Sequence, residues 1–98
     1  MSYADFVKAD MRLTVLKLLE QQNCYKLNEY VLHSALKQSA HAVSREQLRA
    51  ELSWLESQGL VRVENFEGIT IVELTERGLD VAQGSAAVPG VKRPAPGK

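Results

Sequence analysis

Residues 44–79 constrain the fold more than any other part of the chain, because local signals for a helix, a stop and a hairpin follow one another there. Ser44 and Gln47 form the signature of a capping box, in which each side chain accepts a hydrogen bond from the other residue's backbone N–H. An apolar face at helical spacing follows, made of Leu48, Leu52 and Leu55. Gly59 stands where a helix needs a left-handed residue to end. The segment therefore predicts a helix that begins after Ser44 and stops at Gly59.

Two β-rich runs come next, Val61–Glu64 and Ile69–Leu74. The tetrad Asn65–Gly68 between them is short enough for a hairpin loop. Thr75 is a good N-cap and predicts a short closing helix after the second strand. Gly78 lies inside this helix, where glycine is expected to lower stability by roughly 1 kcal/mol relative to alanine.

Two further helices are expected before Ser44. Asp5–Gln22 predicts one helix whose apolar residues spread over a wide arc, which is typical of a helix buried on two sides. The second side faces either the chain's own domain or a second subunit. Asn28 is a fair N-cap for the next helix, whose expected buried set is Val31, Leu32, Ala35 and Leu36. A solvent-exposed charge ladder is expected on another face, at Glu29, His33 and Lys37.

Size and composition indicate one small domain with a single core. The core is expected to contain Leu16, Leu19, Leu32, Leu36, Leu48, Leu52, Leu55, Leu60, Val63 and Leu74. No run reaches the roughly 18 apolar residues that a membrane span needs, and the first residues lack the apolar segment of a signal peptide. With one cysteine, no intrachain disulfide is possible, and a reducing cytoplasm is the expected location.

Charge is uneven along the chain although the formal net charge is zero. Residues 1–84, the predicted domain, hold nine Lys/Arg against twelve Asp/Glu and are net −3. Residues 85–98 are net +3 and contain all three prolines, so a disordered basic tail is expected there. A mildly acidic body counts against strong nonspecific affinity for DNA.

The order helix, Gly-Leu-Val, hairpin and Leu-Thr-x-x-Gly resembles the second half of a winged helix-turn-helix domain. Arg12–Gln22 and Leu27–Gln38 resemble its first two helices. The combination of WLESQGLV, LTERGLDVA and VPGVKRPAP resembles a family of small uncharacterised proteins of Mu-like phages and prophages. The resemblance implies an α+β fold with a three-helix core, a two-stranded wing and a short closing helix. It also implies a phage or prophage transcriptional regulator that binds double-stranded DNA as a homodimer.

In the winged-helix resemblance, the N-terminal half of the third helix enters the major groove, where arginine can bridge guanine O6 and N7. Arg45, Gln47 and Arg49 are the expected base-reading positions, and Ser44 or Ser53 would reach phosphate. An ordinary solvated helix face would carry much the same residues. The rival function is therefore a winged helix used as a protein-interaction module, in phage assembly or as an adaptor for a host factor.

The predicted hairpin favours the rival function. Glu64 and Glu67 flank its tip, and phosphates would repel both. Phe66 at the tip either staples the loop or contacts a protein partner. Trp54 lies off the leucine face of its helix, where it either packs under the hairpin or joins an interface.

Catalysis has little support in the sequence. The unusual groups available for it are Cys24, His33 and His41, and none has partners at the spacing of a metal site or a catalytic motif. We therefore expect no enzyme activity, no metal and no cofactor.

Overall fold

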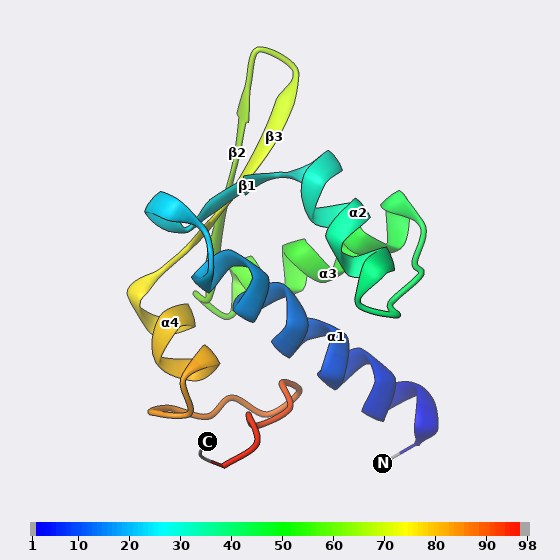
Figure 1. The fold of residues 1–98 in the computed structure, drawn as a ribbon, viewed down its shortest axis with the longest axis vertical. Helices are drawn as coiled ribbons and strands as arrows, with labels where there is room; N and C mark the ends of the chain where they lie inside the picture. The colour runs from blue at the N-terminus through cyan, green and yellow to red at the C-terminus, as the bar shows by residue number, and fades with distance from the viewer. Residues whose placement is uncertain (1, 97–98) are drawn as a thin grey trace.

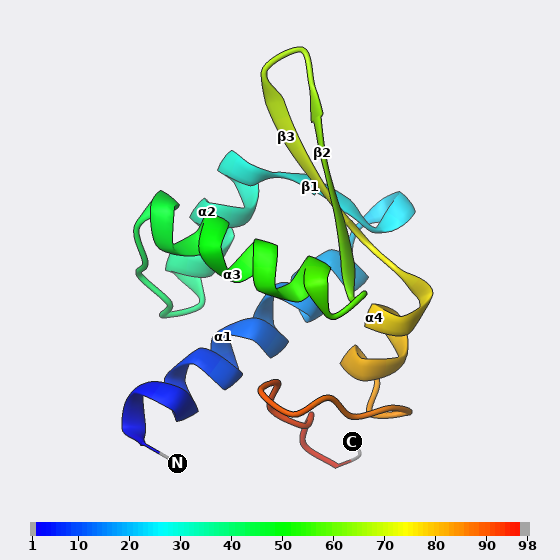
Figure 2. The same ribbon diagram turned by 180° about the vertical axis from the view of Figure 1, so that it is seen from behind.

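Three helices make up most of the chain before the wing (Figure 1). The computed structural model describes residues 2–96. The helices are α1 (Tyr3–Glu20), α2 (Glu29–Gln38) and α3 (Arg45–Ser57), and a 3₁₀ turn, Asn23–Tyr25, follows α1. The long helix α1 crosses α3 in both views (Figures 1 and 2).

A three-stranded antiparallel sheet completes the fold, in the order β1-β3-β2, with β1 contributed from between α1 and α2. Strands β2 (Val61–Phe66) and β3 (Ile69–Leu74) make the projecting wing, and α4 (Glu76–Ala82) closes the domain. Strand β1 (Lys26–Asn28), which pairs with β3, has no local signal in the sequence and was not predicted. The wing is longer than predicted, because only Glu67 and Gly68 form the turn. Both have positive φ, +51° and +83°, as a two-residue type I′ turn requires.

The local signals in residues 44–79 are confirmed. Ser44 and Gln47 exchange their two capping hydrogen bonds at 3.0 Å. Gly59 is left-handed at φ +77°, and the N–H of Leu60 donates to the carbonyl oxygen of Leu55 at 3.0 Å, which completes the helix stop. Thr75 Oγ1 accepts from the N–H of Gly78 at 3.0 Å and begins α4.

One core fills the space between the helices and the sheet. Nine of the ten expected core residues are buried in it, and Val63 packs against it half-buried. The expectation for α2 is wrong at two positions: Val31 is 48% exposed, whereas Glu29 is 1% exposed. Glu29 lies one turn before Leu32 on the same helical face, so this face carries it into the interior.

The chain after α4 differs from the expected disordered tail. We call residues 85–96 the C-terminal strap. It lies against α1, where Val88 and Val91 join the core and the N–H of Lys92 donates to the carbonyl oxygen of Ala9 at 3.1 Å. Two valines thus give apolar contact to a segment whose glycines and prolines suggested none. Gly97 and Lys98 lie outside the described residues.

Candidate nucleic-acid interface

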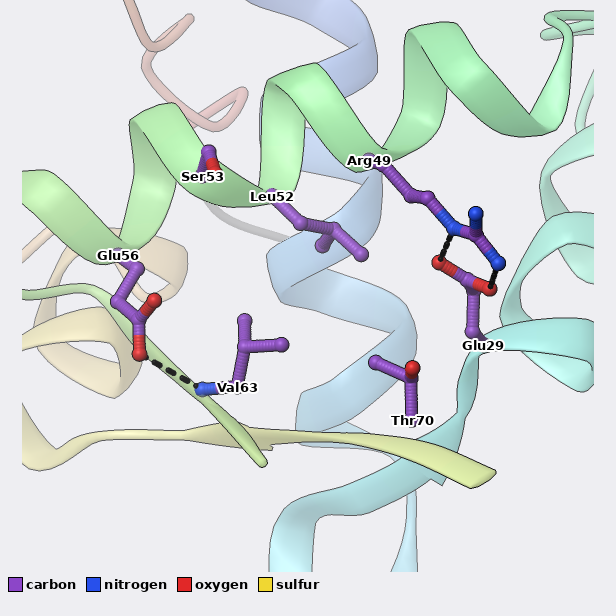
Figure 3. Close-up of a pocket in the computed structure, with 7 residues that line it drawn as sticks. All are labelled: Glu29, Arg49, Leu52, Ser53, Glu56, Val63 and Thr70. Atoms are coloured by element: carbon purple, nitrogen blue, oxygen red, sulfur yellow. Dashed lines mark hydrogen bonds and ion pairs between the residues drawn. The ribbon is translucent and has the colours of Figure 1, made fainter. Parts of the chain in front are cut away.

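The predicted DNA-reading residues lie along α3 and at its N-cap. Ser44, Gln47, Arg49 and Ser53 are exposed, and Arg45 is half-buried. They do not share one side of the helix. Arg49 and Ser53 line a hollow of about 210 Å³ between α3 and the wing (Figure 3). Gln47 instead lines a separate hollow between α3 and the first turns of α1.

The carboxylate of Glu29, which was expected in solvent, binds two arginines on the wing side of α3. Arg49 donates from Nε and Nη2 to the two oxygens of Glu29, at 2.8 and 3.0 Å (Figure 3). Arg45 Nη2 lies 3.5 Å from the same carboxylate. The hydrogen bonds from Arg49 lower the pKa of Glu29 although burial opposes them. Glu29, the first residue of α2, is therefore an anion held against the first turns of α3.

The pairing leaves part of Arg49 able to bind a ligand. Nε and one hydrogen of Nη2 face Glu29, so Nη1 and the second hydrogen of Nη2 remain as a parallel pair of donors. The side chain of Arg49 is 59% exposed. Such a pair matches guanine O6 and N7. Because Glu29 is fixed in α2, the plane of the guanidinium is set before any ligand arrives.

Arg45 lies differently from its predicted role. Its guanidinium stacks over the ring of Tyr30 at 4.1 Å from the centroid, and its Nε is buried without a hydrogen-bond partner among residues 2–96. The side chain is thus drawn back toward α2 by Glu29 and Tyr30. Neither contact has a local signal in the sequence, because a charged residue at the start of a helix is usually in solvent.

The wing offers acidic and apolar groups at its tip. Glu64 and Glu67 are exposed, and Phe66 is 66% exposed opposite Ile69. Phe66 therefore leaves most of its surface in solvent instead of packing on the loop. Arg62, nearer the base, lies 3.5 Å from Glu73 across the strands.

Trp54 packs against the C-terminal strap and not under the hairpin. The guanidinium of Arg12 lies 3.9 Å from the centroid of the indole ring, and Nη1 of Arg12 donates to the carbonyl oxygen of Gly90 at 3.0 Å. Arg12 Nε also pairs with Glu51 at 2.6 Å. The chain itself thus covers part of Trp54, one of the two residues predicted to contact a protein partner.

The two histidines have structural partners. His33 Nε2 lies 2.6 Å from the carbonyl oxygen of Val43, so the predicted solvent ladder with Glu29 and Lys37 is wrong. His41 Nε2 lies 2.9 Å from Asp10, whose other oxygen accepts from Lys92 at 3.1 Å. Within residues 2–96, no group of three His, Cys, Asp or Glu side chains is placed to hold a metal ion. In the same range no helix is long and apolar enough to cross a membrane.

Known proteins resemble the chain in sequence and in fold. It is 46% identical over 92 residues to the uncharacterised protein gp26 of Escherichia phage Mu, a match that covers 94% of this chain and 95% of gp26. It is 34% identical over 97 residues to an uncharacterised protein of Haemophilus influenzae, covering 98% of this chain and 94% of the relative. No family model matches the chain.

A solved structure gives the fold. AbsC, a MarR family transcriptional regulator from Streptomyces coelicolor, matches 74% of this chain with a TM-score of 0.62 and 24% sequence identity. The match spans 47% of the AbsC chain, about half its length. The likeness confirms the predicted winged helix-turn-helix fold. The chain belongs to the family of phage Mu gp26, whose fold here is a winged helix-turn-helix.

Proposed function

We propose that this protein binds double-stranded DNA and acts as a transcriptional regulator of phage or prophage type. In this proposal α3 enters the major groove, and the protein works as a homodimer in the cytoplasm. The winged helix-turn-helix fold supports the proposal, since the MarR family regulator AbsC shares it. The relation to gp26 of phage Mu supports the phage setting.

The ion pair between Arg49 and Glu29 carries the proposal. Arg49 keeps two parallel donors directed outward, on the helix that winged-helix proteins place in the major groove. More than half of the Arg49 side chain lies in solvent although it pairs with the buried Glu29, so its remaining donors are open to a ligand. Ser53 lines the same hollow as Arg49, and Ser44 lies exposed at the start of the helix.

Selection of sites from random duplex DNA, followed by titration of variants, tests the proposal. Arg49→Ala is expected to lower the affinity for the selected site by roughly tenfold or more and to relax discrimination at one guanine. Arg62→Ala is the matched control, because it removes the same charge from an exposed arginine on the wing. Its effect should be equal on all sequences. Failure of the wild-type chain to retain any duplex at 50 mM salt would contradict the proposal.

One observation favours a second function, a protein-interaction module. The wing tip combines exposed Phe66 and Ile69 with Glu64 and Glu67. This surface complements an apolar pocket with a basic rim, and it repels phosphate. Under this function, Phe66→Ala abolishes binding of the partner while Arg49→Ala leaves it unchanged. Trp54 contributes only if the partner displaces Gly90 and the rest of the strap.

A further inference from the structure

Glu29 lies at the point where the sheet, α2 and α3 meet. It directly follows β1, whose last residue, Asn28, pairs with Ile71 of the wing strand β3. Asn28 also begins α2, because its side-chain oxygen accepts from the N–H of Val31 at 2.9 Å. The backbone of Glu29 is therefore fixed by the sheet on one side and by the first turn of α2 on the other. Its side chain, 2% exposed, points from this junction toward α3 (Figure 3).

The carboxylate of Glu29 holds one edge of the Arg49 guanidinium. Nε and Nη2 of Arg49 donate to different oxygens of this carboxylate, at 2.8 and 3.0 Å. Two parallel hydrogen bonds fix the plane of a guanidinium as well as its position. Arg45 Nη2 lies 3.5 Å from one of the same oxygens. A rotation of the Glu29 side chain would therefore leave two arginines without this partner.

The two edges of the Arg49 guanidinium differ in what they can bind. Glu29 closes the edge at Nε, and the edge formed by Nη1 and Nη2 stays open on a side chain that is 59% exposed. Arg49 and Glu29 together carry no net charge, so the pair attracts a phosphate less strongly than a free arginine would. The donors of the open edge still match two acceptors in one plane, such as guanine O6 and N7. The carboxylate thus favours a base edge over the DNA backbone as the ligand of Arg49.

We propose that Glu29 is a positioning residue for DNA recognition, which holds Arg49 by its Nε edge and thereby makes it a reader of guanine instead of a binder of phosphate. Glu29 itself does not touch DNA in this arrangement, because its side chain is buried. The inference rests on the proposed function and assigns part of the sequence specificity to a residue outside α3. It also connects Arg49 with the wing, because Glu29 follows the strand that pairs with β3.

Nuclear magnetic resonance of the full chain without DNA tests the positioning. In the wild type, the Nε–H of Arg49 is expected to exchange slowly with water, because it donates to a buried carboxylate. Glu29→Asp keeps the charge but is one methylene shorter, so it cannot reach Arg49 with both oxygens, and the exchange should become faster. Glu73→Asp is the matched control, because it shortens a carboxylate that pairs with another arginine, Arg62. It should leave the Arg49 signal unchanged.

Titration with the selected site, with the same site lacking its guanine and with random-sequence duplex tests the consequence for DNA. Glu29→Gln releases Arg49 and should lower discrimination between the first two duplexes by roughly tenfold. Its affinity for random duplex should not fall, and its slope of log affinity against log salt should steepen by about one, because one more cation is available to phosphate. A substitution that only destabilised the fold would lower all three affinities together.

Glu73→Gln is the control for charge, since it removes one carboxylate from the pair with Arg62. Its discrimination should equal that of the wild type. Glu29→Asp, which retains the charge, should lower discrimination without steepening the salt slope. It decides the question if Glu29→Gln does not fold.

Three results would overturn the proposal: equal exchange of the Arg49 Nε–H in the wild type and Glu29→Asp, discrimination unchanged in the Glu29 variants, or a parallel loss of all three affinities. A wild type that reads guanine equally well without Glu29 contradicts this inference alone. A wild type that binds no duplex contradicts the proposed function as well, and the exchange measurement then shows separately whether Glu29 holds Arg49.

Discussion

Glu29 links two helices of the helix-turn-helix, because its buried carboxylate on α2 pairs with arginines of α3. Burying a carboxylate costs free energy unless the charge is paired and hydrogen-bonded. Arg49 and Arg45 supply the pairing from another helix, and the pKa of Glu29 is lowered as a result. A group whose pKa is lowered by folding stabilises the folded state above its unfolded pKa. That contribution is lost as the pH falls through the folded pKa.

Glu29→Gln is therefore expected to lower the free energy of unfolding by roughly 1.5–3 kcal/mol at pH 7, as for other hydrogen bonds to charged groups. The difference from the wild type should shrink as the pH falls below the usual range of a glutamate. Urea denaturation at pH 7 and at pH 3 measures both values. The lowered pKa of Asp10 acts equally in the two proteins and cancels. A difference that stays constant with pH would contradict the role given to the ionised carboxylate.

Gly78 offers a second residue-level prediction, in the direction opposite to helix propensity. A Cβ at this position would lie 2.1 Å from the carbonyl oxygen of Leu60 and 2.7 Å from a methyl group of Leu74. Alanine is the better helix former by roughly 1 kcal/mol, but it would force α4 away from the end of α3 and the sheet. Gly78→Ala should thus destabilise the domain by about 1–3 kcal/mol. Ser53→Ala, exposed on α3, is the control, and a melting temperature raised by Gly78→Ala would refute this explanation.

At the scale of elements, the sequence predicts what its local chemistry determines. The caps at Ser44 and Thr75 and the stop at Gly59 need only neighbouring residues, so the helix boundaries there were predictable. Strand β1 was not, because three residues become a strand only by pairing with β3. The same holds for Glu29: the arginines that make its burial tolerable follow sixteen and twenty positions later.

The C-terminal strap is the element that composition described least well. Glycines and prolines predicted disorder, whereas Val88 and Val91 are 5% and 8% exposed. The core that these valines join exists only in the folded domain. Arg12 and Asp10 then hold the strap through Gly90 and Lys92. The composition of the tail alone predicts disorder. The observed packing depends also on the surface of the folded domain that receives Val88 and Val91.

Truncation after Gly84 should consequently lower the melting temperature, an effect that a disordered tail would not produce. Val91→Ala tests the contact alone and should cost roughly 1–2 kcal/mol, given about 0.8 kcal/mol for each buried methylene-sized group. Thermal unfolding followed by circular dichroism measures both changes. Arg93→Ala is the control, because this side chain lies on the exposed part of the strap. Equal stability of Val91→Ala and the wild type would mean that the strap is not packed in solution.

Charge balance becomes important at the scale of the whole molecule. The chain has as many acidic as basic residues, and several cations are engaged with carboxylates. Ion pairs within 4.0 Å occupy Arg12, Arg45, Arg49, Arg62 and Lys92. The contact between Lys92 and Asp10 leaves fewer cations available in the C-terminal strap. Specific contacts at α3 therefore have to supply most of any affinity for DNA.

Salt dependence of binding to random-sequence duplex measures this balance. With about two phosphates neutralised per chain, nonspecific affinity should fall by only about tenfold between 50 and 200 mM salt. A protein with six to ten phosphate contacts loses about 10³–10⁵ over the same range. Arg93→Ala should reduce the slope of log affinity against log salt by about one, since this arginine has no ion pair among residues 2–96. Arg12→Ala should leave the slope unchanged, because Glu51 and Gly90 hold Arg12. A wild-type slope equivalent to six or more phosphates would mean that DNA binding breaks these ion pairs, and the charge balance of the isolated fold would then not describe the bound protein.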